Sequence, residues 1–148
     1  MKKRFETFTV LINRISRNIR KIKNQEMAEY NLRSSHISCL YYLYSAGSIT
    51  ATELCEQCEE DKATVSRALD YLEENRYLSC ESKSPKRYKS PLALTEKGLA
   101  IGEKIADKIN SVLDEVGSGL TETERVAFYH SLSVISEGLE SVANKYSR

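Results

Sequence analysis

The sequence has no long apolar run, and no stretch approaches the ~20 apolar residues that a helix needs to cross a bilayer. Its N-terminus is basic but leads into charged amphipathic sequence, unlike a secretory signal. Both absences argue against a membrane or exported protein. With 148 residues, 41% of them hydrophobic and 29% charged, the composition is typical of one soluble globular domain, which we expect in the cytoplasm.

Groups that catalyse reactions or bind metals are also scarce. There are only two histidines, His36 and His130, and neither has a nucleophile at motif spacing. No glycine loop of the phosphate-cradling kind is present. Cys55 and Cys58 form the only close cysteine pair, with no second pair at zinc-finger spacing. We therefore expect no enzyme, no catalytic or metal-ligating residues and no cofactor.

The four cysteines leave two interpretations open. In a reducing compartment they are buried or incidental thiols, or they take part in thiol-based sensing. A reactive thiol needs cationic neighbours, whereas the close pair is flanked by Glu53, Glu56 and Glu59.

Residues 49–98 carry most of the information. Thr50 and Glu53 have the spacing of a capping box, and Ile49 can pack on Leu54 as a hydrophobic staple, so a helix is expected to start here. A second helix is expected from Asp61, its N-cap, to about Glu74. The spacing predicts two helices joined by a short turn.

The second of these helices has two different faces. One carries the apolar stripe Val65, Ala68, Leu69 and Leu72, which is expected to be buried. Because recognition helices present their first residues to base edges in the major groove, this face pattern predicts four DNA-reading residues: Lys62, Thr64, Ser66 and Arg67. The alternative is an ordinary amphipathic surface helix.

A basic hairpin follows. Residues 77–82 and 88–94 are expected to form two strands, with Pro91 on the outer edge because proline cannot donate to a ladder. The basic tip of this hairpin is suited to bind the minor groove and the phosphates of DNA, and Arg87 is the candidate for insertion into the groove. The expected phosphate contacts are Lys83, Lys86 and Lys89. A helix-turn-helix followed by such a wing favours duplex DNA as the partner.

Long helices flank this segment. Apolar residues alternate at spacings of three and four near both ends of the chain: Phe5, Phe8, Ile12, Ile15, Ile19 and Ile22, and again Leu132, Ile135, Leu139, Val142 and Tyr146. Further helices are expected at 34–45 and about 95–116, and Thr121 with Glu124 begins the last one. The terminal helices are expected to pair, either within one chain or with those of a second copy as a homodimer.

The expected fold is mainly α with a small β wing, a winged helix-turn-helix in one domain, 1–148. Its DNA-binding lobe would span about 32–98, and 1–30 and 99–148 would supply dimerisation helices. The segments Asp61–Leu78 and Leu92–Gly98 resemble the MarR family of transcriptional regulators, although Pro85-Lys86-Arg87-Tyr88 lacks the aspartate of the family's Asp-x-Arg wing tip. The resemblance implies a homodimeric repressor of a pseudo-palindromic operator, relieved by a small molecule or by oxidation.

Effectors in that family often bind between the dimerisation helices and the DNA-binding lobe. The aromatic residues expected near this junction either fill the core or line a pocket for an aromatic ligand: Tyr30, His36, Tyr41 and Tyr44. The leading hypothesis is a sequence-specific DNA-binding regulator. The alternative is a winged-helix module that binds another protein through its acidic 53–60 surface.

Overall fold

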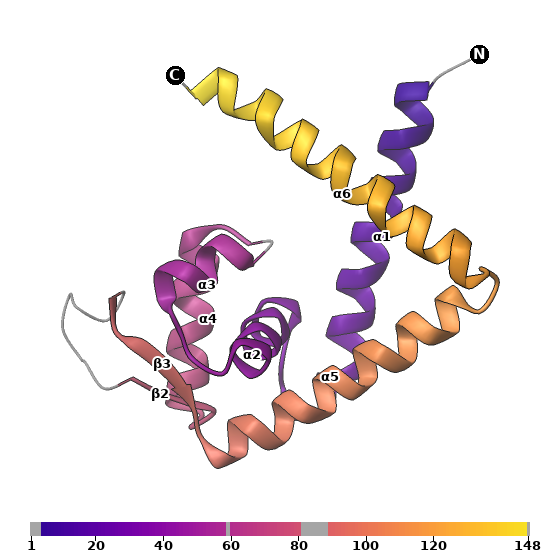
Figure 1. Ribbon diagram of the computed structural model, residues 1–148. Coiled ribbons are helices and arrows are strands. Elements are labelled where there is room, and N and C mark those ends of the chain that lie inside the picture. Colours follow the sequence, from indigo (N-terminus) through magenta and orange to yellow (C-terminus); the bar gives the residue numbers. More distant parts are fainter. Residues whose placement is uncertain (1–3, 59, 81–88, 148) are drawn as a thin grey trace. The chain divides into compact units, whose positions relative to one another are not determined.

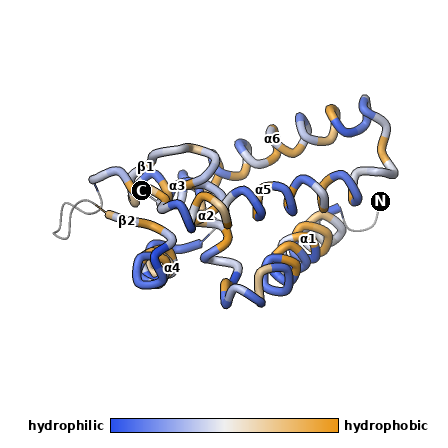
Figure 2. Tube along the Cα trace, turned by 90° about the horizontal axis from the view of Figure 1, so that it is seen from below, coloured by the Kyte–Doolittle hydropathy of each residue, from blue (hydrophilic) through white to orange (hydrophobic). Residues whose placement is uncertain are grey.

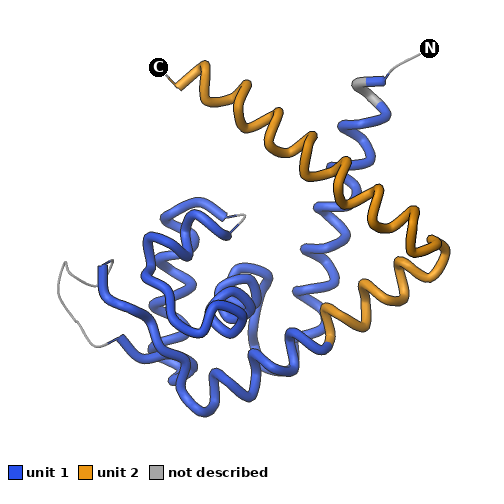
Figure 3. Tube along the Cα trace, viewed as in Figure 1, with its two compact units in different colours: residues 1–107 blue, residues 108–148 orange. Residues whose placement is uncertain are grey.

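The computed structural model describes residues 4–58, 60–80 and 89–147. The chain divides into two compact units, residues 1–107 and 108–148 (Figure 3). Most of the secondary structure is helical, with one small antiparallel sheet (Figure 1). The expected fold, mainly α with a small β wing, is confirmed.

The first unit contains α1 (Arg4–Glu26), the short 3-10 helix η1 (Ala28–Tyr30), α2 (Ser34–Ala46), α3 (Ala51–Gln57) and α4 (Lys62–Glu74). Its strands are β1 (Ile49–Thr50), β2 (Leu78–Cys80) and β3 (Pro91–Leu94). Helix α5 (Glu96–Gly117) begins in this unit and ends in the second, which also holds α6 (Glu122–Asn144) and η3 (Lys145–Ser147). The helices expected at 34–45, 61–74 and 95–116 are confirmed within one residue at each end.

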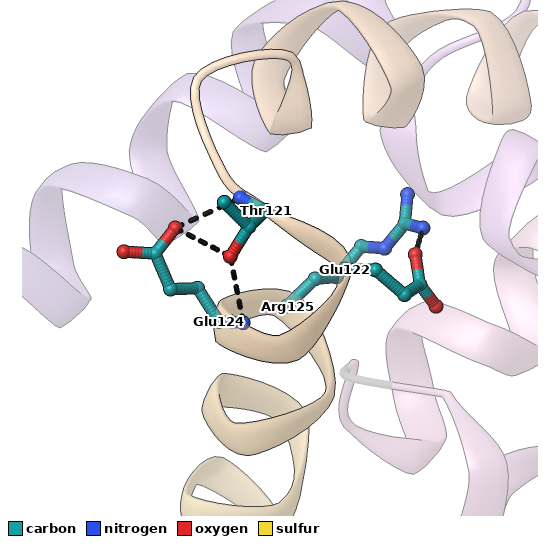
Figure 4. Close-up of polar contacts among 4 residues, drawn as sticks. All are labelled: Thr121, Glu122, Glu124 and Arg125. Carbon is teal, nitrogen blue, oxygen red and sulfur yellow. Dashed lines mark hydrogen bonds and ion pairs between the residues drawn. The ribbon is translucent and has the colours of Figure 1, made fainter.

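Two expected capping boxes are present. The Glu53 N–H donates to Thr50 Oγ1 at 3.2 Å, and the Thr50 N–H donates to the Glu53 carboxylate at 2.7 Å. Thr121 and Glu124 repeat this exchange at 3.3 and 2.8 Å at the start of α6 (Figure 4). Beside it, Glu122 and Arg125 form an ion pair one turn apart. Each box gives acceptors to N–H groups that the helix itself leaves unsatisfied.

The core of the first unit lies where α2, α3 and α4 meet the sheet. Leu40, Leu54, Val65, Leu72 and Leu92 have no exposed surface, so each element contributes at least one fully buried side chain. Burying an aliphatic side chain of this size stabilises a fold by about 1.5–3 kcal/mol. These contacts position α4 on the rest of the unit.

The sheet differs from the expected two-stranded hairpin. Its order is β1-β3-β2, so β3 is the central strand and the short strand β1 was not foreseen. Pro91 pairs with Thr50, and the expectation that it lies on the outer edge is wrong. Proline is tolerated there because it is the first residue of β3, a position where a missing N–H costs little. Part of each expected strand (residues 81, 82 and 88) lies outside the described residues.

Two glycines let α5 approach its neighbours closely. A Cβ built at Gly98 would lie 1.9 Å from the Tyr77 carbonyl oxygen, and one at Gly102 would lie 2.8 Å from Tyr44 Cβ. The start of α5 is also fixed by Thr95, whose hydroxyl donates to the Arg76 carbonyl at 2.6 Å. Helix α5 therefore continues from β3 with little freedom.

We predict that Gly98→Ala destabilises the protein, because the methyl group would overlap a backbone oxygen that has nowhere to move. The expected loss is about 1–3 kcal/mol in the free energy of unfolding, measured by urea denaturation. Gly117→Ala is the matched control, since nothing lies within 4 Å of its Cβ position. Equal stability of the two variants would contradict this packing.

Helix α6 has 23 residues and none of them is buried. Four residues of the expected seam, Ile135, Leu139, Val142 and Tyr146, are between 41% and 85% exposed. Hydrophobic positions recur among hydrophilic ones along both α1 and α6 (Figure 2). No described helix combines the length and the apolar character that crossing a membrane requires. An amphipathic helix of this kind is stabilised by covering its apolar face.

Candidate nucleic-acid interface

The start of α4 is held by its N-cap. Asp61 accepts the Thr64 N–H at 2.8 Å with one carboxylate oxygen and the Thr64 hydroxyl at 3.1 Å with the other. These two hydrogen bonds, the backbone bond first, lower the pKa of Asp61, so its carboxylate stays ionised. The negative charge of this cap also interacts favourably with the positive end of the helix dipole. The expected N-cap is confirmed.

The two faces of α4 differ as expected. Its apolar stripe, Val65, Ala68, Leu69 and Leu72, is buried. At the start of the helix Lys62 and Arg67 are exposed, and Thr64 and Ser66 are half-buried. All four predicted reading residues thus lie on the first two turns with at least part of their side chains accessible.

Arg67 is held along the helix. Its Nη2 donates to Thr64 Oγ1 at 3.2 Å, and Thr64 in turn donates to Asp61. The Asp61 carboxylate also attracts the Arg67 guanidinium. A side chain in this arrangement points toward the start of α4, and it loses less conformational freedom on binding than a fully mobile arginine would.

The wing is only partly described. Strands β2 and β3 pair with Leu78 opposite Leu94 and Cys80 opposite Leu92. Lys89, one predicted phosphate contact, is exposed just before β3. The other predicted wing contacts, Lys83, Lys86 and Arg87, lie outside the described residues.

A pocket of about 400 Å³ lies beside the start of α4, between that helix and the start of α2. His36 and Tyr71, which both line it, stack on each other with ring centroids 4.2 Å apart and planes 14° from parallel. The Tyr71 hydroxyl donates to the Asn31 carbonyl at 2.8 Å. The lining residues are Asn31, Arg33, Ser35, His36, Thr64, Arg67, Ala68 and Tyr71. Sequence reasoning missed Arg33 and Tyr71, because no local pattern links positions about forty residues apart.

The four residues expected near an effector site do not share this pocket, which His36 alone of them lines. Tyr30 accepts a hydrogen bond from Lys104 Nζ at 3.1 Å, so it faces α5. Tyr44 packs against Gly102, which also belongs to α5. The Tyr41 ring meets the edge of Tyr42 at a centroid distance of 5.4 Å.

Cys39 and Cys55 lie in surroundings that favour neutral thiols. A hydrogen bond with Cys58, followed by burial, raises the pKa of the Cys39 thiol. Burial is the first cause that raises the pKa of Cys55. Cys58 is the C-cap of α3, where its N–H donates to the Leu54 carbonyl at 2.9 Å. Across residues 4–58, 60–80 and 89–147, no cluster of His, Cys, Asp and Glu could hold a metal ion.

Comparison with known proteins supports the geometric assignment. The MarR family model matches residues 30–87, which include the pocket and α4. The uncharacterized HTH-type transcriptional regulator YwoH of Bacillus subtilis is 29% identical over 119 residues, which are 80% of this chain and 86% of YwoH. Over residues 30–87, the chain is similar to the MarR family of transcriptional regulators.

Solved structures of this family share the fold. The Staphylococcus aureus MepR–DNA complex superposes with a TM-score of 0.76 at 18% identity, over 89% of this chain and 97% of MepR. Bordetella bronchiseptica BpsR, whose DNA binding is regulated by 6-hydroxynicotinic acid, superposes with a TM-score of 0.74 at 23% identity, over 88% of this chain and 99% of BpsR. MarR proteins are transcriptional regulators and not enzymes, as the sequence led us to expect.

The His36 imidazole predicts a pH dependence of stability. Burial, then the Arg33 charge, lowers the pKa of His36, and its Nδ1 accepts the Arg33 N–H at 3.0 Å, which needs a deprotonated nitrogen. The neutral imidazole therefore contributes fully to the free energy of unfolding above the ordinary histidine pKa near 6.5. This contribution is lost as the pH falls through the lower pKa that His36 has in the folded protein.

His36→Gln keeps an acceptor at the third helical position but does not titrate. From pH 7.5 to about pH 5, the wild type should lose more free energy of unfolding than this variant, as measured by urea denaturation at each pH. Identical pH dependences of the two proteins would contradict this assignment.

Proposed function

We propose that this protein binds a specific operator as a homodimer, with the start of α4 in the major groove. The observation that supports this most directly is the division of α4 into a buried stripe and a capped, accessible first half. A reading helix must be held rigidly on one side and be open on the other. The DNA-binding lobe of the protein would span about residues 32–98, and residues 1–30 and 99–148 would form the dimerisation helices.

The four predicted reading residues of α4 have chemically suitable roles. Arg67 can donate two hydrogen bonds to guanine O6 and N7, and Thr64 and Ser66 can meet bases or phosphates. Lys62, at the first helical position, suits a phosphate or a base edge. Glu74 is exposed near the end of α4, where its charge would repel phosphate, so only the first half of the helix enters the groove.

The wing residues complete the proposed contact surface. Arg87 would enter the minor groove, where arginine responds to groove width and negative potential. Lys83, Lys86 and Lys89 would contact phosphates and contribute affinity without sequence preference. Only Lys89 belongs to the described part of the chain, where it is exposed.

The homodimer is supported by the uncovered apolar residues of α1 and α6. Ile12, Ile15 and Ile19 of α1 are each more than a third exposed, as are Ile135, Leu139 and Val142 of the α6 seam. A two-fold dimer would cover such surfaces and would place two reading helices about 34–36 Å apart, one turn of DNA. The operator would then be pseudo-palindromic, and its occupancy near a promoter would repress transcription. A small-molecule effector would act by changing the spacing of the two reading helices.

Salt titration distinguishes DNA binding from the protein-interaction alternative. Affinity for random duplex DNA should fall with salt, with a log–log slope of about 0.9 per phosphate neutralised. An affinity that does not respond to salt would favour a protein partner for the acidic α3 surface.

We predict that Arg67→Ala reduces the preference for operator over random DNA by about 1–3 kcal/mol, because a bidentate base contact is lost. Fluorescence anisotropy with both duplexes measures this preference. Glu74→Ala, two turns further along the exposed face of α4, is the control and should leave the preference unchanged. Equal weakening of both duplexes by Arg67→Ala would make Arg67 a backbone contact.

We predict that Leu139→Glu weakens dimerisation by tenfold or more, because a carboxylate in an apolar interface costs at least about 1.4 kcal/mol. Sedimentation equilibrium measures the dissociation constant. Ser141→Glu places the same charge about half a helical turn away and serves as the control. If the wild type is a monomer at micromolar concentration, the α6 seam is not a dimer interface.

A further inference from the structure

The pocket beside α4 carries positively charged side chains that base recognition by α4 does not explain. It brings together two guanidinium side chains from different elements, Arg33 before α2 and Arg67 on α4. Both arginines are exposed, so their charge is available to a partner. Two guanidinium groups at one pocket favour an oxyanion, which can accept several of their N–H groups at once.

The first turn of α2 adds N–H donors to the same pocket. A helix leaves its first four N–H groups without intrahelical acceptors. In α2 the Arg33 N–H donates to His36 Nδ1 at 3.0 Å, and the Ser34 N–H donates to Asn24 Oδ1 at 2.7 Å. The next two N–H groups, of Ser35 and His36, belong to residues that line the pocket. Such groups and the helix dipole attract an anion at this end.

The pocket is held in shape by contacts on both sides of Arg33. Leu32 is 1% exposed and Ser34 is 9% exposed, so the backbone on either side of Arg33 is fixed in the core. The stacked rings of His36 and Tyr71, with the hydrogen bond from Tyr71 to Asn31, tie the start of α2 to α4. The donors are therefore arranged before a ligand arrives, which reduces the entropic cost of binding.

The position of the pocket identifies the source of the anion. Thr64 and Arg67 line the pocket and also belong to the accessible start of α4. A duplex whose major groove receives this part of α4 would bring a phosphate of its backbone to the adjoining pocket. We infer that the pocket beside α4 binds one operator phosphate per protomer, with Arg33 and the first turn of α2 as donors.

This inference rests on the proposed DNA binding and adds a residue that positions the reading helix. A phosphate contact carries no sequence information, but it fixes the depth and direction at which α4 enters the groove. Arg67 lines the same pocket and is held along α4 by its hydrogen bond to Thr64.

The test compares Arg33→Ala with the wild type on operator and random duplexes over a range of salt concentrations. Loss of one charge-assisted contact per protomer should weaken binding to both duplexes equally, on the order of tenfold per protomer. The log–log salt slope should fall by about 0.9 per protomer. Arg20→Ala is the matched control, because it removes an exposed guanidinium from α1 and should leave the slope nearly unchanged.

Arg33→Lys keeps the charge and protects the test against a folding defect. It should restore most of the salt slope, and urea denaturation should show the stability of both Arg33 variants to be close to that of the wild type. An unchanged affinity and slope for Arg33→Ala would overturn the inference. So would a loss confined to the operator, which would make Arg33 a base contact.

A free oxyanion is the other source of the same chemistry. Inorganic phosphate, compared with chloride at equal ionic strength, would then raise the melting temperature of the wild type but not of Arg33→Ala. If duplex binding were unaffected by the substitution at the same time, the pocket would hold a free anion, and the inference would be overturned. Failure of the wild type to bind duplex DNA at all would instead contradict the proposed function.

Discussion

The packing of one face of α4 on the core is the constraint on which the interface depends. Val65, Ala68, Leu69 and Leu72 are buried against the first unit, so the rotation of α4 about its own axis is fixed. Lys62 and Arg67 then have to face outward. The Asp61 cap fixes where the helix begins and, through Thr64, the direction of Arg67. Burial of one face and accessibility of the other are two results of the same packing.

The elements around α4 support this arrangement. Helix α2 is tied to it by the His36–Tyr71 stack and by the Tyr71–Asn31 hydrogen bond. Helix α5 packs closely on Tyr77 and Leu94 at Gly98 and on Tyr44 of α2 at Gly102. A change in α5 can therefore reach the reading surface through β3 and the short chain between α4 and β2. In the proposed homodimer, such a connection would let events at α5 alter DNA binding.

Features set by local chemistry could be predicted from the sequence. The caps at Thr50, Asp61 and Thr121 depend on residues three positions apart, and all three are present. The buried stripe of α4 follows from helical periodicity alone. Features set by distant pairing could not be predicted. Strand β1 exists because Ile49 pairs with Leu92, and this pairing makes β3 central and places Pro91 inside the sheet.

The pocket likewise depends on contacts between distant parts of the chain, so the sequence could not predict it. Arg33 has no signature in its own segment, and its importance appears only when α2 lies beside α4. His36 was expected with Tyr30, Tyr41 and Tyr44, but an imidazole ring stacks on whichever aromatic ring the fold brings to it, here Tyr71. The predicted reading residues needed only the α4 pattern, and all four lie on the first two turns of α4, with Lys62 and Arg67 exposed and Thr64 and Ser66 half-buried.

Selection of bound duplexes from a random pool with the full chain would show whether two copies of α4 read an inverted repeat. We expect half-sites about 10 bp apart from centre to centre, with a guanine in each half-site whose enrichment disappears in Arg67→Ala. Recovery of sequences with no enriched motif, or of one half-site without its inverted copy, would contradict it.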